Sequence, residues 1–155
     1  MSKAFTSEET PDTGPVVRQP PRLAPGEVRY VTPEGAAELR AEAARARDAG
    51  QIERAALLEG TLATLTVLGP DAAPDGKVAF GTWVVVEDEE GKRFEWRIVG
   101  PDEADPKRGL VSVNAPVARA LLGRTAGEAV EVARPGGEVE LVVVEVRREP
   151  PVRSS

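Results

Sequence analysis

The stretch Ser112-Val-Asn-Ala-Pro-Val-Ala-Arg-Ala-Leu-Leu-Gly123 decides how the second half of this chain folds. An apolar segment, 110–113, stops at the polar corner Asn114-Ala115-Pro116, where proline suits the first turn of a helix. Gly123 suits the position after the helix, because glycine adopts positive φ without strain. One helix face is expected to be buried, since apolar residues recur at helical spacing at Val117, Ala120 and Leu121. The pattern predicts a corner raised on a rigid strand–helix junction, and it also fits an ordinary strand-to-helix turn.

Composition narrows the classes of activity. The chain has 155 residues, enough for one domain with a core or for a small core with appendages. It contains neither cysteine nor histidine, which excludes disulfides, thiolate metal sites and both Ser-His-Asp and Cys-His catalysis. The net charge of −6 disfavours direct nucleic-acid binding as the main activity. With no apolar run of membrane-spanning length and no signal-peptide core, we expect a cytoplasmic protein.

The sequence of the first half of the chain predicts a tail, followed by a short antiparallel helical hairpin over 29–70. Residues 1–28 are rich in proline and poor in large apolar side chains, so this tail is expected to be disordered. Thr32-Pro33-Glu34 is a helix-start signal for a helix over 33–48, and a second helix is expected over 52–68. Each arm would be about 24 Å long. The apolar stripe of the second arm comprises Ile52, Ala55, Leu58, Leu62 and Leu65.

Residues 71–76 are predicted to form a linker. Over 77–149 apolar and polar residues alternate with a period of two, as in strands, and 150–155 is interpreted as a frayed tail. This pattern predicts an α+β domain with one short helix on an antiparallel sheet. The last strand has apolar residues on both faces, which indicates a central strand or a curved sheet. The acidic loop over 102–105 is interpreted as a solvated turn rather than a cation site. The expected strands are 77–87, 92–99, 110–113, 129–133 and 138–147.

The run from Ile98 to Gly123 strongly resembles the C-terminal domain of the GreA/GreB transcript-cleavage factors, and the similarity extends over 77–148. Over the hairpin it is weaker, and there Tyr30 to Leu39 looks like the start of the family's first helix. The further matching segments are Val78-Ala-Phe-Gly-Thr-Trp83, Thr125-Ala-Gly-Glu-Ala-Val130 and Arg134-Pro-Gly-Gly137.

The resemblance implies an FKBP-like fold and docking at the rim of the secondary channel of bacterial RNA polymerase. There the corner would press on a coiled coil of the largest catalytic subunit. The matching residues are Asn114, Ala115 and Pro116, to which we add Arg119 of the adjoining helix. Family members usually carry serine at the position of Ala115. The change removes a hydroxyl able to cap the helix, a loss of about 1 kcal/mol.

The hairpin tip departs from the family. The resemblance implies a long hairpin with a Gly-Asp-Leu-Ser-Glu-Asn type tip, whose acids help to hold a second catalytic metal, because hard cations prefer oxygen ligands. The matching stretch here is Gly50-Gln-Ile-Glu-Arg54. Gln51 replaces the first acid, Glu53 is one residue out of register, and Asp48 is the other acid near the turn. Short arms also make the chain similar to the short-hairpin Rnk proteins.

We therefore expect a monomeric, polymerase-binding elongation regulator that does not stimulate transcript cleavage, with no cofactor and no catalytic residues of its own. It would compete with cleavage factors, or alter nucleotide entry and pausing. Two alternatives stay open. One is an FKBP-like peptidyl-prolyl isomerase, although Phe94 and Trp96 are expected to be needed by the core. The other is a generic protein-interaction module.

Overall fold

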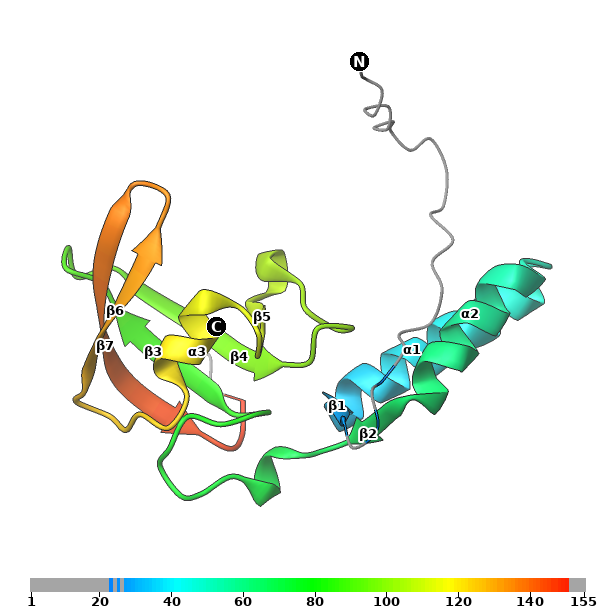
Figure 1. Cartoon of the computed structure of the whole chain (residues 1–155), viewed down its shortest axis with the longest axis horizontal. Helices are drawn as coiled ribbons and strands as arrows, with labels where there is room; N and C mark the ends of the chain where they lie inside the picture. The colour runs from blue at the N-terminus through cyan, green and yellow to red at the C-terminus, as the bar shows by residue number, and fades with distance from the viewer. Residues whose placement is uncertain (1–22, 24, 26, 151–155) are drawn as a thin grey trace, which may run out of the picture. The chain divides into compact units, whose positions relative to one another are not determined.

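A computed structural model describes residues 23, 25 and 27–150, which fall into two compact units. The first unit contains 39–64, and the second contains the described residues of 23–38 together with 65–150. Figure 1 shows their elements. The predicted tail 1–28 lies almost wholly outside the described residues, as does 151–155. In the part of the chain that is described, no helix combines the length and apolarity needed to cross a membrane.

The hairpin helices are α1 (Pro33–Asp48) and α2 (Ile52–Ala63). Thr32 caps α1, because its Oγ1 accepts a hydrogen bond of 3.0 Å from the amide of Gly35. The prediction for the second helix was wrong at both of its ends, where Ile52 and Leu65 were expected to belong to a buried apolar stripe. The helix stops at Ala63 rather than at residue 68, and the side chain of Ile52 is 53% exposed.

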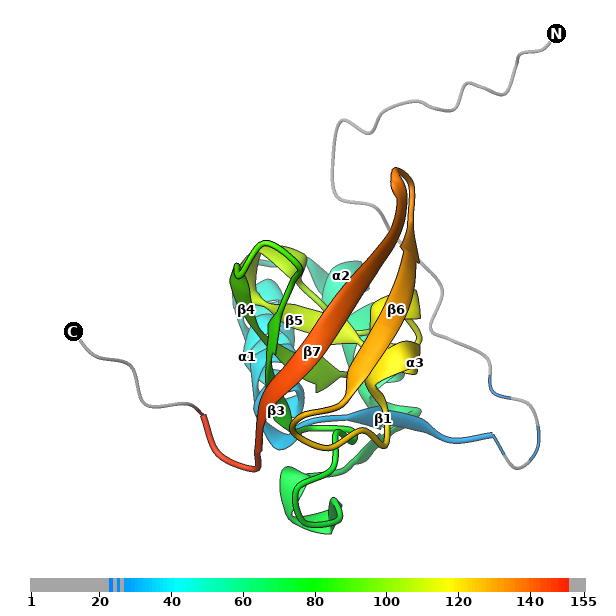
Figure 2. The same cartoon turned by 90° about the vertical axis from the view of Figure 1, so that its left-hand side faces the viewer.

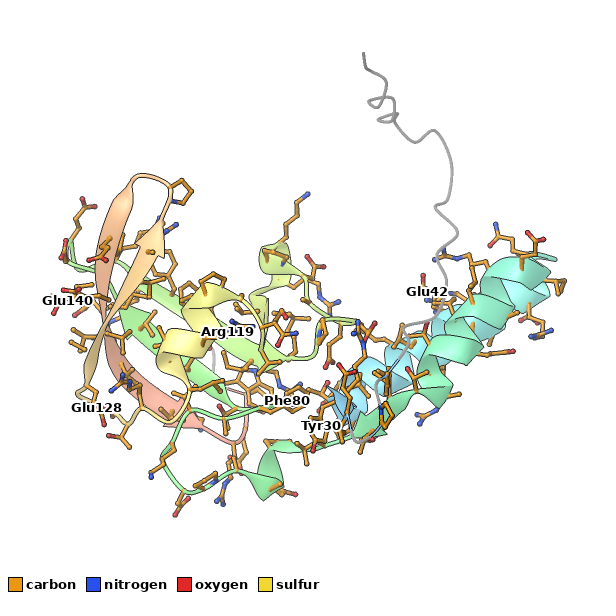
Figure 3. All side chains as sticks on the ribbon, in the orientation of Figure 1. Tyr30, Glu42, Phe80, Arg119, Glu128 and Glu140 are labelled. Atoms are coloured by element: carbon orange, nitrogen blue, oxygen red, sulfur yellow. The ribbon has the colours of Figure 1, made fainter. Side chains whose placement is uncertain are left out.

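Two short strands flank the hairpin in sequence and pair in parallel in the second unit: β1 (Arg29–Val31) and β2 (Leu65–Val67). Neither strand was predicted, because each is only three residues long and is stabilised by a partner far along the chain. The pairing is extended by the amide of Leu68, which donates to the carbonyl of Val31 at 2.9 Å. Tyr30 of β1 packs on Phe80, with ring centroids 5.7 Å apart (Figure 3).

The main sheet has five strands in the order β5-β4-β3-β7-β6. The pair β4 and β5 is parallel and the other pairs are antiparallel, so the predicted antiparallel sheet is mixed at one edge. Figure 2 shows the hairpin of β6 and β7 as a long twisted ribbon. The α+β class is confirmed. The strands are β3 (Trp83–Glu87), β4 (Arg93–Val99), β5 (Leu110–Ser112), β6 (Ala129–Arg134) and β7 (Gly137–Arg147).

The core of this unit lies between the sheet and helix α3 (Pro116–Leu121), which Figure 1 shows against the strands. Ala118 and Leu121 of α3 are fully buried, whereas Val117 and Ala120 of the predicted face are only partly buried, so the prediction holds fully for Leu121 and missed Ala118. Ala118 and Leu121 join a cluster that includes Val84, Val86, Ile98, Leu141 and Val143. Because buried side chains interdigitate at near-crystalline density, this packing fixes α3 and therefore the corner that precedes it.

Strand β7 lies between β3 and β6 and contains a bulge, since Val85 pairs with Glu145 whereas Val86 pairs with Val143. The extra residue, Val144, shifts the alternation of faces. Leu141 and Val143 are buried before the bulge, and Val146 packs against the core after it. A central, bulged strand explains why apolar residues occur on both faces of this segment.

The segment before β3 differs from its prediction. The strand expected over 77–87 begins only at Trp83, because residues 79–82 form a turn in which Gly81 has a φ of +87°. A short 3₁₀ helix, η2 (Pro70–Ala72), opens the segment predicted as a linker. Ala73 is buried there, and its carbonyl accepts a 2.7 Å hydrogen bond from the Arg148 guanidinium.

Candidate functional site

The corner between β5 and α3 is fixed by hydrogen bonds to Ser112 and by the proline that begins the helix. The amide of Asn114 donates to Ser112 Oγ at 3.1 Å, and the amide of Ala115 donates to the carbonyl of Ser112 at 2.9 Å. Ala115 is the helix N-cap in an extended conformation without a side-chain cap, and Pro116 is the first helical residue. Asn114 and Pro116 are exposed. The corner therefore presents a fixed polar and apolar surface rather than a reactive group.

Arg119 lies one turn along α3 from the corner and is exposed (Figure 3). Four predicted site residues are thus brought together on one junction: Asn114, Ala115, Pro116 and Arg119. The remaining predicted residues, Asp48, Gln51 and Glu53, lie at the hairpin turn in the first unit.

The hairpin turn consists of the three residues between α1 and α2, with Gly50 at a φ of +81°. Gln51 is the N-cap of α2 and makes no side-chain capping bond, and Asp48 and Glu53 are exposed. Arginines neutralise the acids further along the arms, in the ion pairs Arg47–Glu59 and Arg54–Glu42. Within the described ranges, no three or more potential metal-ligating side chains form a group.

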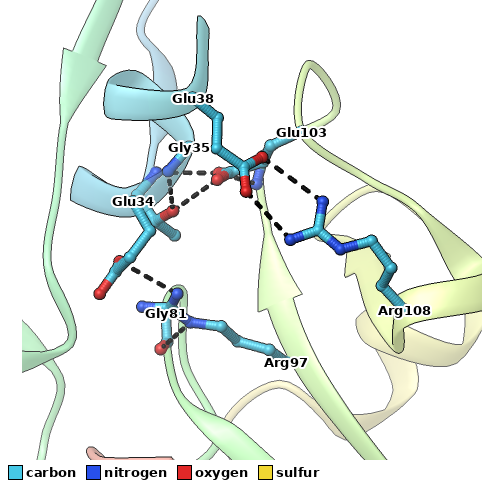
Figure 4. Close-up of polar contacts among 9 residues, drawn as sticks. Glu34, Gly35, Glu38, Gly81, Arg97, Glu103 and Arg108 are labelled. Atoms are coloured by element: carbon cyan, nitrogen blue, oxygen red, sulfur yellow. Dashed lines mark hydrogen bonds and ion pairs between the residues drawn. The ribbon is translucent and has the colours of Figure 1, made fainter. Parts of the chain in front are cut away.

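A polar cluster that the sequence did not predict joins the start of α1 to loops of the main sheet within the second unit (Figure 4). The carboxylate of Glu103 accepts hydrogen bonds from the amides of Thr32 and Gly100, both at 2.8 Å, and from the Thr32 hydroxyl. Glu38 forms a two-pronged ion pair with Arg108 at 3.0 and 3.4 Å. No local signal could have revealed the contacts of Glu103 with Thr32 and of Glu38 with Arg108, because these partners are about seventy positions apart.

Arg97 is the buried cation of this cluster, with its side chain only 6% exposed. Its Nε donates to the carbonyl of Gly81 at 2.9 Å, its Nη1 pairs with Glu34 at 3.1 Å, and its guanidinium lies 4.0 Å from the centre of the Trp83 ring. Partial burial by itself would raise the pKa of Glu34. Backbone hydrogen bonding and the Arg97 guanidinium outweigh burial, so this pKa lies below its usual value.

The acidic loop after β4 is not the solvated turn that was predicted. Asp102 binds Arg29 through Nε at 2.6 Å and Nη2 at 3.1 Å, and this bond raises the pKa of Arg29. Asp105 accepts from the amide of Lys107 at the start of the 3₁₀ helix η3 (Pro106–Arg108). Asp102 and Glu103 therefore bind residues about seventy positions away, whereas Asp105 only caps the short helix that follows it.

The second half of the chain is similar to proteins of known family. The family model described as transcription elongation factor, GreA/GreB, C-term matches residues 73–148. The GreA of Alkalilimnicola ehrlichii is 51% identical over 92 residues, which cover 58% of each chain. The GreB of Yersinia pestis is 41% identical over 63% of this chain and 57% of its own length. The chain thus spans less than two thirds of these two relatives.

A longer match extends into the hairpin. The GreB of Pseudomonas aeruginosa is 35% identical over 164 positions, which cover 85% of this chain and 96% of that relative. Only 85% of this chain, about 132 residues, takes part in these positions, so about 32 residues of that GreB have no counterpart here. The solved GreA/GreB factor from Nitrosomonas europaea is 27% identical over 78% of this chain and 98% of its own, with a TM-score of 0.44. On the sequence matches, the chain belongs to the GreA/GreB family of transcription elongation factors.

Proposed function

We propose that this protein binds bacterial RNA polymerase as a monomer and regulates elongation at the secondary channel without stimulating transcript cleavage. Its docking surface is the corner formed by Asn114, Ala115 and Pro116, with Arg119 beside it. The coiled coil at the channel rim, in the largest catalytic subunit, is the docking partner. The observation that carries the proposal is the contrast between a rigidly built, exposed corner and a hairpin turn without paired acids.

The corner supports docking because its geometry is fixed before any partner arrives. Ala118 and Leu121 anchor α3 in the core, and two hydrogen bonds to Ser112 close the turn. A preorganised surface loses little conformational entropy on binding, so more of the contact energy contributes to affinity. Pro116 adds rigidity, because its ring fixes φ at the start of the helix.

The hairpin supports regulation without cleavage. With 16 and 12 residues, α1 and α2 are about 24 and 18 Å long. At the turn, an amide of Gln51 replaces a carboxylate, and Arg54 follows Glu53 and is paired with Glu42. Displacing catalytic groups by 1 Å costs about a hundredfold in rate, so shortened arms with this turn would not organise a second metal.

Binding is tested by competition. The full chain and the GreB of Pseudomonas aeruginosa would be titrated against bacterial core RNA polymerase, with the double variant Asn114→Ala, Pro116→Ala and the control Pro74→Ala, Lys77→Ala. The control residues are exposed and belong to the same unit. We expect displacement of GreB by the wild type and the control, and an affinity about tenfold weaker for the corner variant. Equal affinity of all three proteins for core polymerase would reject the corner as the docking surface.

Cleavage is tested on backtracked complexes with end-labelled RNA. We expect no shortening of the RNA when the purified chain is added, and slower shortening by GreB when the chain is added first. RNA shortening by the chain alone would show that Asp48 and Glu53 suffice and would refute the non-cleaving assignment.

A further inference from the structure

A polar pocket of about 250 Å³ lies within the second unit, at the start of α1 and the adjoining part of the main sheet. Two guanidinium groups line it, from Arg97 of β4 and Arg108 of η3 (Figure 4). Three carboxylates also line it, and they belong to Glu34, Glu38 and Glu103. The pocket therefore contains charges of both signs, and burial decides which of them are fixed in place.

The guanidinium of Arg97 is the fixed cation of this pocket. Its side chain is only 6% exposed, its Nε donates to the carbonyl of Gly81, and its face lies on the Trp83 ring. Its Nη1 contacts Glu34 at 3.1 Å, whereas its Nη2 is buried and has no hydrogen-bond partner among the described residues. An oxyanion binds a guanidinium most strongly when two nitrogens donate to it. The contact with Glu34 thus leaves half of this edge unused, and a buried donor without an acceptor is unfavourable.

The carboxylates differ in how firmly they are held. The side chains of Glu34 and Glu38 are 65% and 58% exposed, and exposed ion pairs contribute little, so both can turn into solvent at small cost. Glu103 stays, because it accepts hydrogen bonds from two amides and a hydroxyl. With the two exposed carboxylates turned outward, two guanidiniums and one carboxylate remain. The first turn of α1 lines the same pocket, and its helix dipole adds positive potential there.

From these observations we infer that the pocket binds a phosphate group, either as the free anion or at the end of a small molecule such as a nucleotide. The phosphate takes the place of the Glu34 carboxylate and accepts hydrogen bonds from Nη1 and Nη2 of Arg97 and from Arg108. A phosphate suits this pocket better than a carboxylate, because its oxygens lie in more than one plane and the two guanidiniums come from different elements. The docking corner does not line this pocket, so the inference is independent of the proposed function.

The test follows the indole N–H signals of the ¹⁵N-labelled full chain by NMR during separate titrations with inorganic phosphate, ATP and succinate. The chain contains two tryptophans, so two signals are expected, and Trp96→Phe assigns them. Trp83 lines the pocket and contacts Arg97, whereas Trp96 does not line it and serves as the internal control. Sodium chloride keeps the ionic strength constant, which separates binding from the screening of charges.

We expect phosphate to shift the Trp83 signal saturably, with a dissociation constant on the order of 1 mM, and to leave the Trp96 signal in place. Glu34→Gln should tighten binding about fivefold, because it removes the carboxylate that competes for Arg97. Arg108→Gln should weaken binding about fivefold, because a charge-assisted hydrogen bond is lost.

The matched controls are Glu87→Gln and Arg93→Gln. These two residues form an ion pair of 3.3 Å in the same unit, neither lines the pocket, and we expect affinities within about twofold of the wild type. Arg97 itself is left unchanged, because removing a buried cation would leave its partners unpaired and disturb the fold.

Several results would overturn the inference. The absence of a saturable Trp83 shift in both the wild type and Glu34→Gln would show that the pocket does not bind phosphate. Equal shifts of both indole signals would indicate a general effect of the added salt. Unchanged or weaker binding by Glu34→Gln would show that this carboxylate does not occupy the place of the ligand, and tighter binding of succinate than of phosphate would assign the pocket to carboxylates.

The ATP titration identifies the source of the phosphate. Tighter binding of ATP than of inorganic phosphate, with the same response to Glu34→Gln and Arg108→Gln, would assign the pocket to the terminal phosphate of a nucleotide. Equal or weaker binding of ATP would assign it to the free anion. Both results support a phosphate site, and neither depends on binding to RNA polymerase.

Discussion

Glu103 shows how one side chain decides local structure in this protein. Its carboxylate accepts hydrogen bonds from two backbone amides and one hydroxyl, so it satisfies the donors at the end of β1 and at Gly100 together. Buried donors left without acceptors cost about 1–3 kcal/mol each, and one carboxylate removes this penalty at two places. The contact also holds Thr32 in the position from which it caps α1.

The ion pair between Glu34 and Arg97 predicts that the folded protein loses stability at acid pH. Because the pKa of Glu34 is lowered in the folded state, its contribution is present above the ordinary value of 4.5 and is lost as the pH falls below it. We expect Glu34→Gln to reduce the loss of thermal stability between neutral and acid pH. Melting curves across that pH range measure this loss, with Glu53→Gln near the hairpin turn as the control. Equal acid sensitivity of both variants and the wild type would contradict this role.

The close packing around Gly100 predicts that a single added methyl group would destabilise the fold. A Cβ at this position would lie 2.1 Å from the backbone carbonyl oxygen of Tyr30, so β1 or the loop would have to move. We expect Gly100→Ala to lower the free energy of unfolding by about 1–3 kcal/mol, the usual cost of overpacking. Chemical denaturation measures the loss. Gly136→Ala is the control, since nothing lies within 4 Å of its Cβ, and an equal loss there would contradict the steric explanation.

At the scale of elements, α3 is a short helix without a side-chain cap. Ala115 occupies the N-cap position with extended backbone angles of φ −69° and ψ 149°. A serine there would place its hydroxyl within reach of the free amides of the first turn. The helix depends on its buried face for stability, because six residues are too few to form a stable helix alone.

This geometry predicts that Ala115→Ser raises the free energy of unfolding by about 1 kcal/mol. Urea denaturation would measure the gain. Ala126→Ser, the same chemical change at an exposed residue outside the helix, should leave the stability unchanged. A neutral or destabilising effect of Ala115→Ser would show that the corner backbone cannot orient the hydroxyl toward the helix.

For the whole molecule, burial predicts an uneven distribution of local stability. The paired strands β3 and β7 contain Val84, Val86 and Val143, which are almost fully buried, whereas Ala55 is the buried residue of α2. Segments with few buried apolar contacts open more easily. We expect amide hydrogen exchange to be slowest in β3 and β7 and faster in α2. Exchange in α2 as slow as in β7 would contradict this order.

Much of the candidate site could be predicted from sequence because its signals are local. The corner, α3 and four of the five strands of the main sheet follow from proline and glycine positions and from hydrophobic periodicity, which act over a few residues. The same signals failed near Gly81 and after Ala63, where three-residue strands and a glycine turn depend on distant partners. They also gave no indication of the bulge at Val144.

The sequence by itself determined the strand–helix corner, the short hairpin and the absence of histidine and cysteine chemistry, because composition and local patterning suffice for these. Only the tertiary structure decided that Glu103 binds Thr32, the cap of α1, and that Arg97 is buried on the Trp83 ring. The physical reason is distance along the chain. Ion pairs, buried carboxylates and pockets are formed by residues tens of positions apart, and their energies depend on a geometry that only the folded chain creates.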